Sequence, residues 1–186
     1  MSFGKIKAAF TDSVNYVVSG ISQYTVTPGR DFTRSRKMEA DKLIFFLVSC
    51  GSSSTKIELL DFFGLQADSP SASAFNQQRT KLLPEAMETV FRRFNSAVLD
   101  GAAPRFRFLA ADGSTFTFFS KPSFSSPEYF VSEGHSSKGF YSMHLNAFYD
   151  LQKHTYSDAL IQPVHQKDEF RAFCDMVDRH DTRPGT

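Results

Sequence analysis

Asp112 is the residue whose surroundings point most directly to chemistry. It follows residues 105–111, where Phe106 and Phe108 alternate with arginines before an unbroken apolar run. This pattern predicts a strand that is half-buried at first and buried on both faces at its end, and Gly113 then predicts a tight turn. A buried carboxylate needs a hydrogen bond, a partner charge or a cation. Asp112 is therefore interpreted either as a turn cap or as a metal ligand.

Spacing alone does not supply a second group for such a site. Asp150 and Asp158 flank a predicted hairpin turn, and Asp150 is expected to be a turn residue. His144 and Asn146 share one face of a predicted strand and would lie near Asp112 if the two strands paired. The alternative, which we favour, is that they are hydrogen-bonded sheet residues. The sequence contains no glycine-rich phosphate loop.

Residues 56–83 have the proportions of a helix-turn-helix motif, with a short helix that ends at Gly64. Amide and guanidinium groups can bind base edges in a DNA groove. The predicted second helix presents four candidates for DNA contact: Asn76, Gln77, Arg79 and Lys81. The alternative, which composition alone favours, is the solvated face of a helical bundle.

A second basic group, Arg34, Arg36 and Lys37, directly precedes another predicted helix. Basic side chains neutralise phosphates without reading sequence, so these residues are candidates for contacts with the DNA backbone. The alternative is a solvated helix start.

These candidates lie on two regions of different character, which predict an α+β chain. Residues 1–100 are predicted to be a helical DNA-binding region, and residues 105–186 are strand-rich. Apolar periodicity predicts helices at residues 3–19, 38–50, 56–63, 70–83 and 84–99. Downstream it predicts strands at residues 105–111, 115–119, 140–150 and 155–163, then a helix at residues 167–179.

Composition limits the function classes without selecting one. The chain has 186 residues, with 21 Lys and Arg against 20 Asp and Glu, so no global basic field requires a nucleic-acid partner. Its 21 phenylalanines can fill a substantial core. Cys50 and Cys174 are expected to be buried free thiols, which fits a reducing cytoplasm. No apolar run approaches a membrane-spanning length, so we expect a cytoplasmic protein without a membrane partner.

Several segments, taken in order from about Asp31 onward, resemble bacterial insertion-sequence transposases of the "insertion sequence four" type. The resemblance to their N-terminal region is carried by residues 32–37 (FTRSRK), 42–44 (KLI), 58–63 (ELLDFF), 73–79 (SAFNQQR) and 81–86 (KLLPEA). The resemblance to the start of their catalytic domain is carried by residues 109–114 (LAADGS), 144–151 (HLNAFYDL) and 158–163 (DALIQP).

The resemblance implies an RNase H-like domain that carries a triad of two aspartates and a glutamate, the DDE triad. Asp112 matches the first acid, and three antiparallel strands and a helix are expected around it. The second and third acids match nothing here, and neither does the family's downstream Tyr, Arg, Glu and Lys signature. The domain is therefore expected to be incomplete, ending about where the fourth strand would begin.

The same resemblance implies cofactors, partners and a location. Two Mg²⁺ ions would serve strand cleavage and transfer, with Asp112 as one ligand. The partner would be double-stranded DNA at terminal inverted repeats, bound by a homodimer in the nucleoid of a bacterial cytoplasm. Two functions remain open: the N-terminal part of a transposase, inactive alone, or a non-catalytic DNA-binding module that occupies transposon ends or regulates transposition.

Overall fold

The computed structural model describes residues 2–99, 106–118, 126–132 and 139–179, and these form an α+β chain. The chain divides into two compact units, Met1–Val98 and Leu99–Thr186, and each is described by itself. Within the described residues, none of the helices combines the length and the apolar character needed to cross a membrane.

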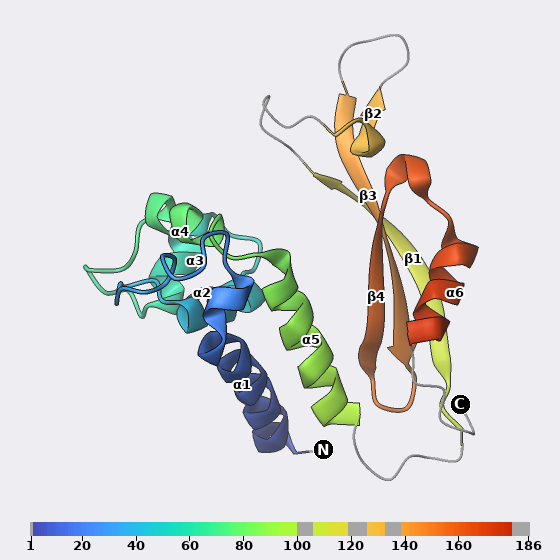
Figure 1. The fold of residues 1–186 in the computed structure, drawn as a ribbon, viewed down its shortest axis with the longest axis horizontal. Coiled ribbons are helices and arrows are strands. Elements are labelled where there is room, and N and C mark those ends of the chain that lie inside the picture. Colours follow the sequence, from blue (N-terminus) through green and yellow to red (C-terminus); the bar gives the residue numbers. More distant parts are fainter. Residues whose placement is uncertain (1, 100–105, 119–125, 133–138, 180–186) are drawn as a thin grey trace. The chain divides into compact units, whose positions relative to one another are not determined.

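The first unit is helical, as the periodicity predicts (Figure 1). Its α-helices are α1 (Phe3–Ser19), α2 (Ala40–Ser49), α3 (Thr55–Phe62), α4 (Ala72–Arg79) and α5 (Pro84–Leu99), and the short 3₁₀ helix η1 (Ile21–Tyr24) follows α1. The helix predicted over residues 70–83 is shorter than expected. Ser71 begins it, because its Oγ accepts a hydrogen bond from the Ala74 amide at 3.1 Å.

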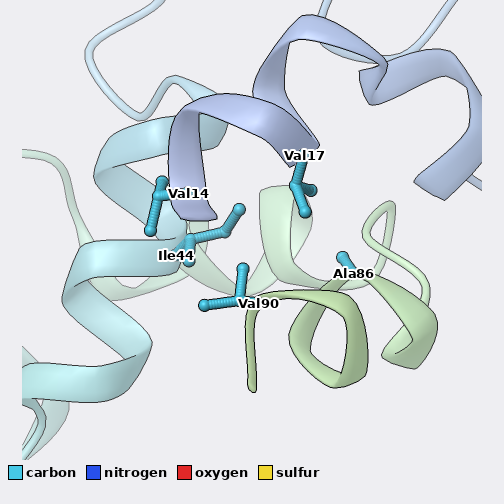
Figure 2. Close-up of a cluster of buried hydrophobic side chains, with 5 residues drawn as sticks. All are labelled: Val14, Val17, Ile44, Ala86 and Val90. Carbon is cyan, nitrogen blue, oxygen red and sulfur yellow. The ribbon is translucent and has the colours of Figure 1, made fainter. Parts of the chain in front are cut away.

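Helix α2 lies between two apolar clusters and holds the helical unit together. The first cluster joins α1, α2 and α5 through Val14, Val17, Ile44, Ala86 and Val90 (Figure 2). The second joins α2, α3 and α4 through Met38, Leu43, Phe46, Leu59 and Phe75. Burial of each such large side chain contributes about 1.5–3 kcal/mol. The two clusters therefore fix α3 and α4 against the rest of the unit.

The second unit is an antiparallel sheet with one helix, α6 (Glu169–Arg179) (Figure 1). Its strands are β1 (Leu109–Phe118), β2 (Phe130–Ser132), β3 (Gly139–Asp150) and β4 (Thr155–Pro163). Strand β3 is central: β1 pairs along one edge, and β4 and β2 pair along the other. The strands predicted at residues 140–150 and 155–163 are confirmed, whereas β2 lies in a segment predicted to be loop.

Strand β1 corrects the prediction at Gly113. Instead of two strands separated by a tight turn, one continuous strand runs from Leu109 to Phe118, with Asp112 and Gly113 in its middle. The predicted burial before Asp112 is also wrong, because Phe106 and Phe108 are more than half exposed and, of the run expected to be buried on both faces, residues 109–110 are half-buried and residue 111 is exposed. Cys50 is likewise exposed rather than buried, while Cys174 is half-buried, and both are free thiols.

The sheet carries α6 on one face, and the row of β3 residues beneath the helix is mostly polar. Ala172 and Met176 of α6 are buried, and the Phe173 ring packs edge-on against Phe148 at 5.4 Å. The buried β3 residues on this face are Ser142, His144, Asn146, Phe148 and Asp150. The alternate β3 residues, Tyr141, Met143, Leu145, Ala147 and Tyr149, are half-buried on the other face.

Candidate nucleic-acid interface and the surroundings of Asp112

A basic concavity of about 540 Å³ lies in the helical unit. It is lined by Thr27, Gly29, Arg30, Asp31, Phe32, Thr33, Arg34, Arg36, Met38, Gln78 and Lys81. Most of these residues belong to the segment between η1 and α2. Gln78 lies in the last turn of α4, and Lys81 follows that helix. The concavity therefore joins two stretches that are far apart in the sequence.

Backbone pairing between the two stretches positions this concavity. Thr25 forms an antiparallel bridge with Leu82. The Val26 amide donates to the Lys81 carbonyl at 3.0 Å, and the Leu83 amide donates to the Tyr24 carbonyl at 2.9 Å. These bonds hold the end of α4 beside the start of the basic segment, so Lys81 meets arginines that precede it by more than forty residues.

A compact turn within the basic segment exposes the arginines. The Asp31 carboxylate accepts a hydrogen bond from the Thr27 amide at 2.9 Å, and the Arg30 amide donates to the Thr27 carbonyl at 3.2 Å. Gly29 and Phe32 have positive φ angles of 74° and 56°. A positive φ is unusual for a bulky residue such as Phe32, and such strain concentrates at functional sites.

Three of the candidate DNA contacts meet at the concavity: Arg34, Arg36 and Lys81. Arg30 also lines it, although the sequence argument did not select Arg30 as a contact. Among the described residues, no carboxylate lies within ion-pair distance of the three guanidinium groups. Cationic side chains that line a concave surface and have no carboxylate partner favour the binding of an anion.

The other candidate contacts lie outside the lining of the concavity. Lys37 forms an exposed ion pair with Asp68 at 3.3 Å, an interaction that contributes little to stability. Asn76 and Gln77 are exposed on α4. The guanidinium of Arg79 lies 5.6 Å from the centre of the Phe75 ring, on the same helix. These α4 side chains remain available for contact with a ligand.

Asp112 is exposed in the middle of β1. Its Oδ1 accepts a hydrogen bond from the Gly113 amide at 2.8 Å. Across the sheet it stands opposite Ala147, which in turn stands opposite Ala159. Residues directly opposite in antiparallel strands share a face. Asp112 therefore has small neighbours on the face opposite α6, and its carboxylate is open to solvent.

His144 and Asn146 lie on the other face, so they do not converge on Asp112. Thr115 Oγ1 and His144 Nδ1 are 3.0 Å apart, which is hydrogen-bond distance. His144 Nε2 lies 3.2 Å from a Glu169 carboxylate oxygen, although without hydrogen-bond geometry. The Asn146 amide donates to Gln162 at 3.0 Å. The interpretation of both as hydrogen-bonded sheet residues is confirmed.

Gly113 has a different role from the predicted turn. A β-carbon at this position would overlap the His144 ring and crowd the Asn146 side chain. The glycine is required because the imidazole of the neighbouring strand lies against the backbone of β1. Residue type alone could not distinguish this close approach from a turn.

Asp150 is a turn residue, as predicted. Its Oδ1 accepts hydrogen bonds from the amides of Gln152 and Lys153 at 2.9 and 2.8 Å, and its Oδ2 accepts one from Arg107 Nε at 3.1 Å. Burial alone would raise the pKa of this carboxyl, but the bonds from Lys153, Gln152 and Arg107 outweigh it and lower the pKa below its ordinary value. Sequence reasoning did not identify Arg107 as the partner.

The described residues do not form a two-metal site around Asp112. Mg²⁺ prefers oxygen ligands, and a two-metal centre needs several carboxylates. Of the carboxylates on described strands, only Asp112 lies on its face of the sheet, because Asp150 and Asp158 face α6. Within the described residues no group of three or more His, Cys, Asp or Glu side chains could hold a metal. No catalytic step through Mg²⁺ is derived from this donor set.

Fold and site together define an α+β protein with a basic concavity in its helical unit and an exposed strand carboxylate in its sheet unit. No protein-family model, curated protein or solved structure matches the chain.

Proposed function

We propose that the chain binds double-stranded DNA through its helical unit, as the N-terminal part of a DDE transposase that acts at terminal inverted repeats. The observation that carries this proposal is the cluster of Arg30, Arg34, Arg36 and Lys81 around one concavity. Guanidinium groups bind phosphate oxygens in a bidentate manner. Cations without carboxylate partners are suited to release counterions when they meet the DNA backbone.

In this proposal the concavity and α4 have different tasks. The concavity binds backbone phosphates, which orient the protein without reading sequence. Helix α4 presents Asn76, Gln77 and Arg79, whose side chains can make bidentate contacts to adenine or guanine. With its side chains an α-helix is about 10–12 Å across, which fits the major groove of about 12 Å width.

The sheet unit contributes Asp112 as the first acid of the triad. The order of β1, β3, β4 and α6, three antiparallel strands followed by a helix, supports an RNase H-like arrangement. The residues in line with Asp112 on the neighbouring strands are Ala147 and Ala159. The further acids that a two-metal site requires would have to come from outside the described residues. Such a protein would act where bacterial DNA lies, in the cytoplasmic nucleoid.

A gel-shift assay with duplex DNA carrying the terminal repeat tests DNA binding. The variant Arg34→Ala/Arg36→Ala/Lys81→Ala should bind at least tenfold more weakly at moderate salt. The slope of log affinity against log salt should fall by about 2–3, because roughly 0.9 is lost per phosphate contact. The matched control, Lys5→Ala/Lys7→Ala, removes two cations from exposed positions of α1 and should bind like the wild type. Equal slopes for all three proteins would contradict the phosphate contacts.

A second candidate is a non-catalytic DNA-binding module that occupies transposon ends or regulates transposition. The observation that favours it is that, among the described strand residues, Asp112 is the single carboxylate on its face of the sheet. Under this candidate, the 186-residue chain binds repeat DNA and shows no Mg²⁺-dependent nicking. In a longer form that cleaves DNA, Asp112→Ala should abolish cleavage and spare binding. Retained cleavage would remove Asp112 from the catalytic role.

A further inference from the structure

The concavity is larger than contact with a single phosphate requires. Its volume of about 540 Å³ falls within the range of about 300–1,000 Å³ that is usual for pockets that enclose small molecules. A phosphate of duplex DNA is met by side chains on an open surface. The dimensions therefore point to a ligand that enters the concavity with more than its phosphate.

The charge around the concavity specifies an anionic ligand. Four basic side chains line it, and Asp31 is its only acidic lining residue among those described. The Asp31 carboxylate already accepts a hydrogen bond from the Thr27 amide. Lys81 donates to the Gln78 side chain at 3.3 Å and, like the three arginines, has no carboxylate partner among the described residues. This excess suits a group with two or more negative charges.

The remaining lining suits a flat apolar ring with polar edges. Phe32 is half-buried and contributes apolar surface, while Met38 is almost completely buried; both pack in the cluster that joins α2, α3 and α4, which fixes Phe32 from behind. The positive φ of Phe32 places its side chain where an ordinary extended backbone would not. Thr33 and the buried Gln78 add hydroxyl and amide groups, which can recognise the edge of a base.

We propose that this concavity binds a nucleotide, with the base against Phe32 and the phosphates on the arginines and Lys81. A free nucleoside diphosphate and an unpaired nucleotide at a DNA end present the same chemistry. The inference rests on the proposed function only if the nucleotide belongs to a DNA end. In that case it adds base recognition to the phosphate contacts of the proposed function.

Calorimetric titration of the 186-residue chain separates the nucleotide from a simple anion. The probes are adenosine, adenosine diphosphate and pyrophosphate. Adenosine diphosphate should bind at least tenfold more tightly than either of the other two, because it alone offers both the base and the charge. Pyrophosphate binding as tight as that of adenosine diphosphate would overturn the proposal and leave an anion site only.

Duplexes with and without a one-nucleotide overhang separate the two sources. A gain of tenfold or more for the overhang assigns the site to a DNA end, and tight adenosine diphosphate binding without that gain assigns it to a free nucleotide. If neither the overhang nor the free nucleotide is preferred, the inference fails. Duplex binding with intact salt dependence would then still support the proposed function, and nucleotide binding without duplex binding would support this inference alone.

A variant that fills the concavity without changing its charge tests the location. Thr33 is exposed and lines the concavity, so Thr33→Trp should weaken nucleotide binding at least tenfold, because the indole would occupy the space of the base. The control is Val26→Trp, at an exposed position near the concavity but outside its lining. Circular dichroism verifies that both variants fold. Unchanged nucleotide binding in folded Thr33→Trp would overturn the placement.

Discussion

Replacement of Asp150 by asparagine should destabilise the sheet unit markedly. The carboxylate is almost completely buried at the end of β3, where it closes the turn into β4 and binds the Arg107 guanidinium. Asparagine keeps an oxygen that can accept from Gln152 and Lys153. It loses the negative charge and turns an amide towards the arginine, so the buried pair is broken from one side.

The magnitude follows from the geometry of this pair. A hydrogen bond to a charged group contributes about 1.5–3 kcal/mol, and breaking a buried ion pair costs about 3–5 kcal/mol. The Arg107 side chain is 21% exposed, so water partly compensates its charge and the lower values apply. We expect a loss of about 2–3 kcal/mol. For a unit of this size that lowers the melting temperature by roughly 8–24 °C.

Urea unfolding, followed through tyrosine, measures the loss. The chain has no tryptophan, and Tyr149 and Tyr156 flank the turn with their rings 5.2 Å apart, so their signal reports on it. The matched control is Asp112→Asn, an exposed change in the same sheet that should shift stability by less than about 0.5 kcal/mol. Equal stabilities of Asp150→Asn and Asp112→Asn would refute the structural role of the pair.

Three further outcomes are expected. Because the pKa of Asp150 is lowered in the folded protein, its contribution to stability is complete above the ordinary pKa of 3.8 and is lost as the pH falls through the folded pKa. Acidification should therefore lower the free energy of unfolding of the wild type more than that of Asp150→Asn. Gly113→Ala should lower the free energy of unfolding by about 1–3 kcal/mol, because the added β-carbon would overlap the His144 ring. An unchanged free energy of unfolding, measured by thermal unfolding, would contradict the close approach of His144 to β1. Arg79→Ala/Lys81→Ala should weaken binding to the terminal repeat roughly 5- to 150-fold in a gel shift. Unchanged binding would mean that α4 presents a solvated face and does not contact DNA.

Local patterns were sufficient to predict most of the elements. The apolar spacing predicts α1 and α5, because each helix buries one apolar face. The alternation of residues 140–150 predicts β3, although it does not show that the mostly polar face is the buried one. Strand β2 could not be predicted, since three residues carry no period. Gly113 was wrongly predicted to form a turn, because the side chain that requires a glycine there, His144, lies on another strand.

The candidate site was predicted only in part, for a similar reason. Arg34, Arg36 and Lys81 are recognisable as cations from the sequence, but their convergence depends on the bridge between Thr25 and Leu82. No local sequence pattern predicts this long-range backbone pairing. Arg30 was missed, although the density of basic residues after Gly29 is a signal that could have included it.

The polar row beneath α6 has a consequence for how the strands find their alignment. In most half-buried sheets a slip of one residue is prevented because it moves apolar side chains into water. Here a slip of β3 would bring Tyr141, Met143 and Leu145 beneath the helix, which apolar burial does not oppose. Alignment must instead depend on matched polar partners such as Thr115 with His144. These hydrogen bonds select the strand register. Their loss would affect the register in which β1 and β3 pair more than the free energy of folding.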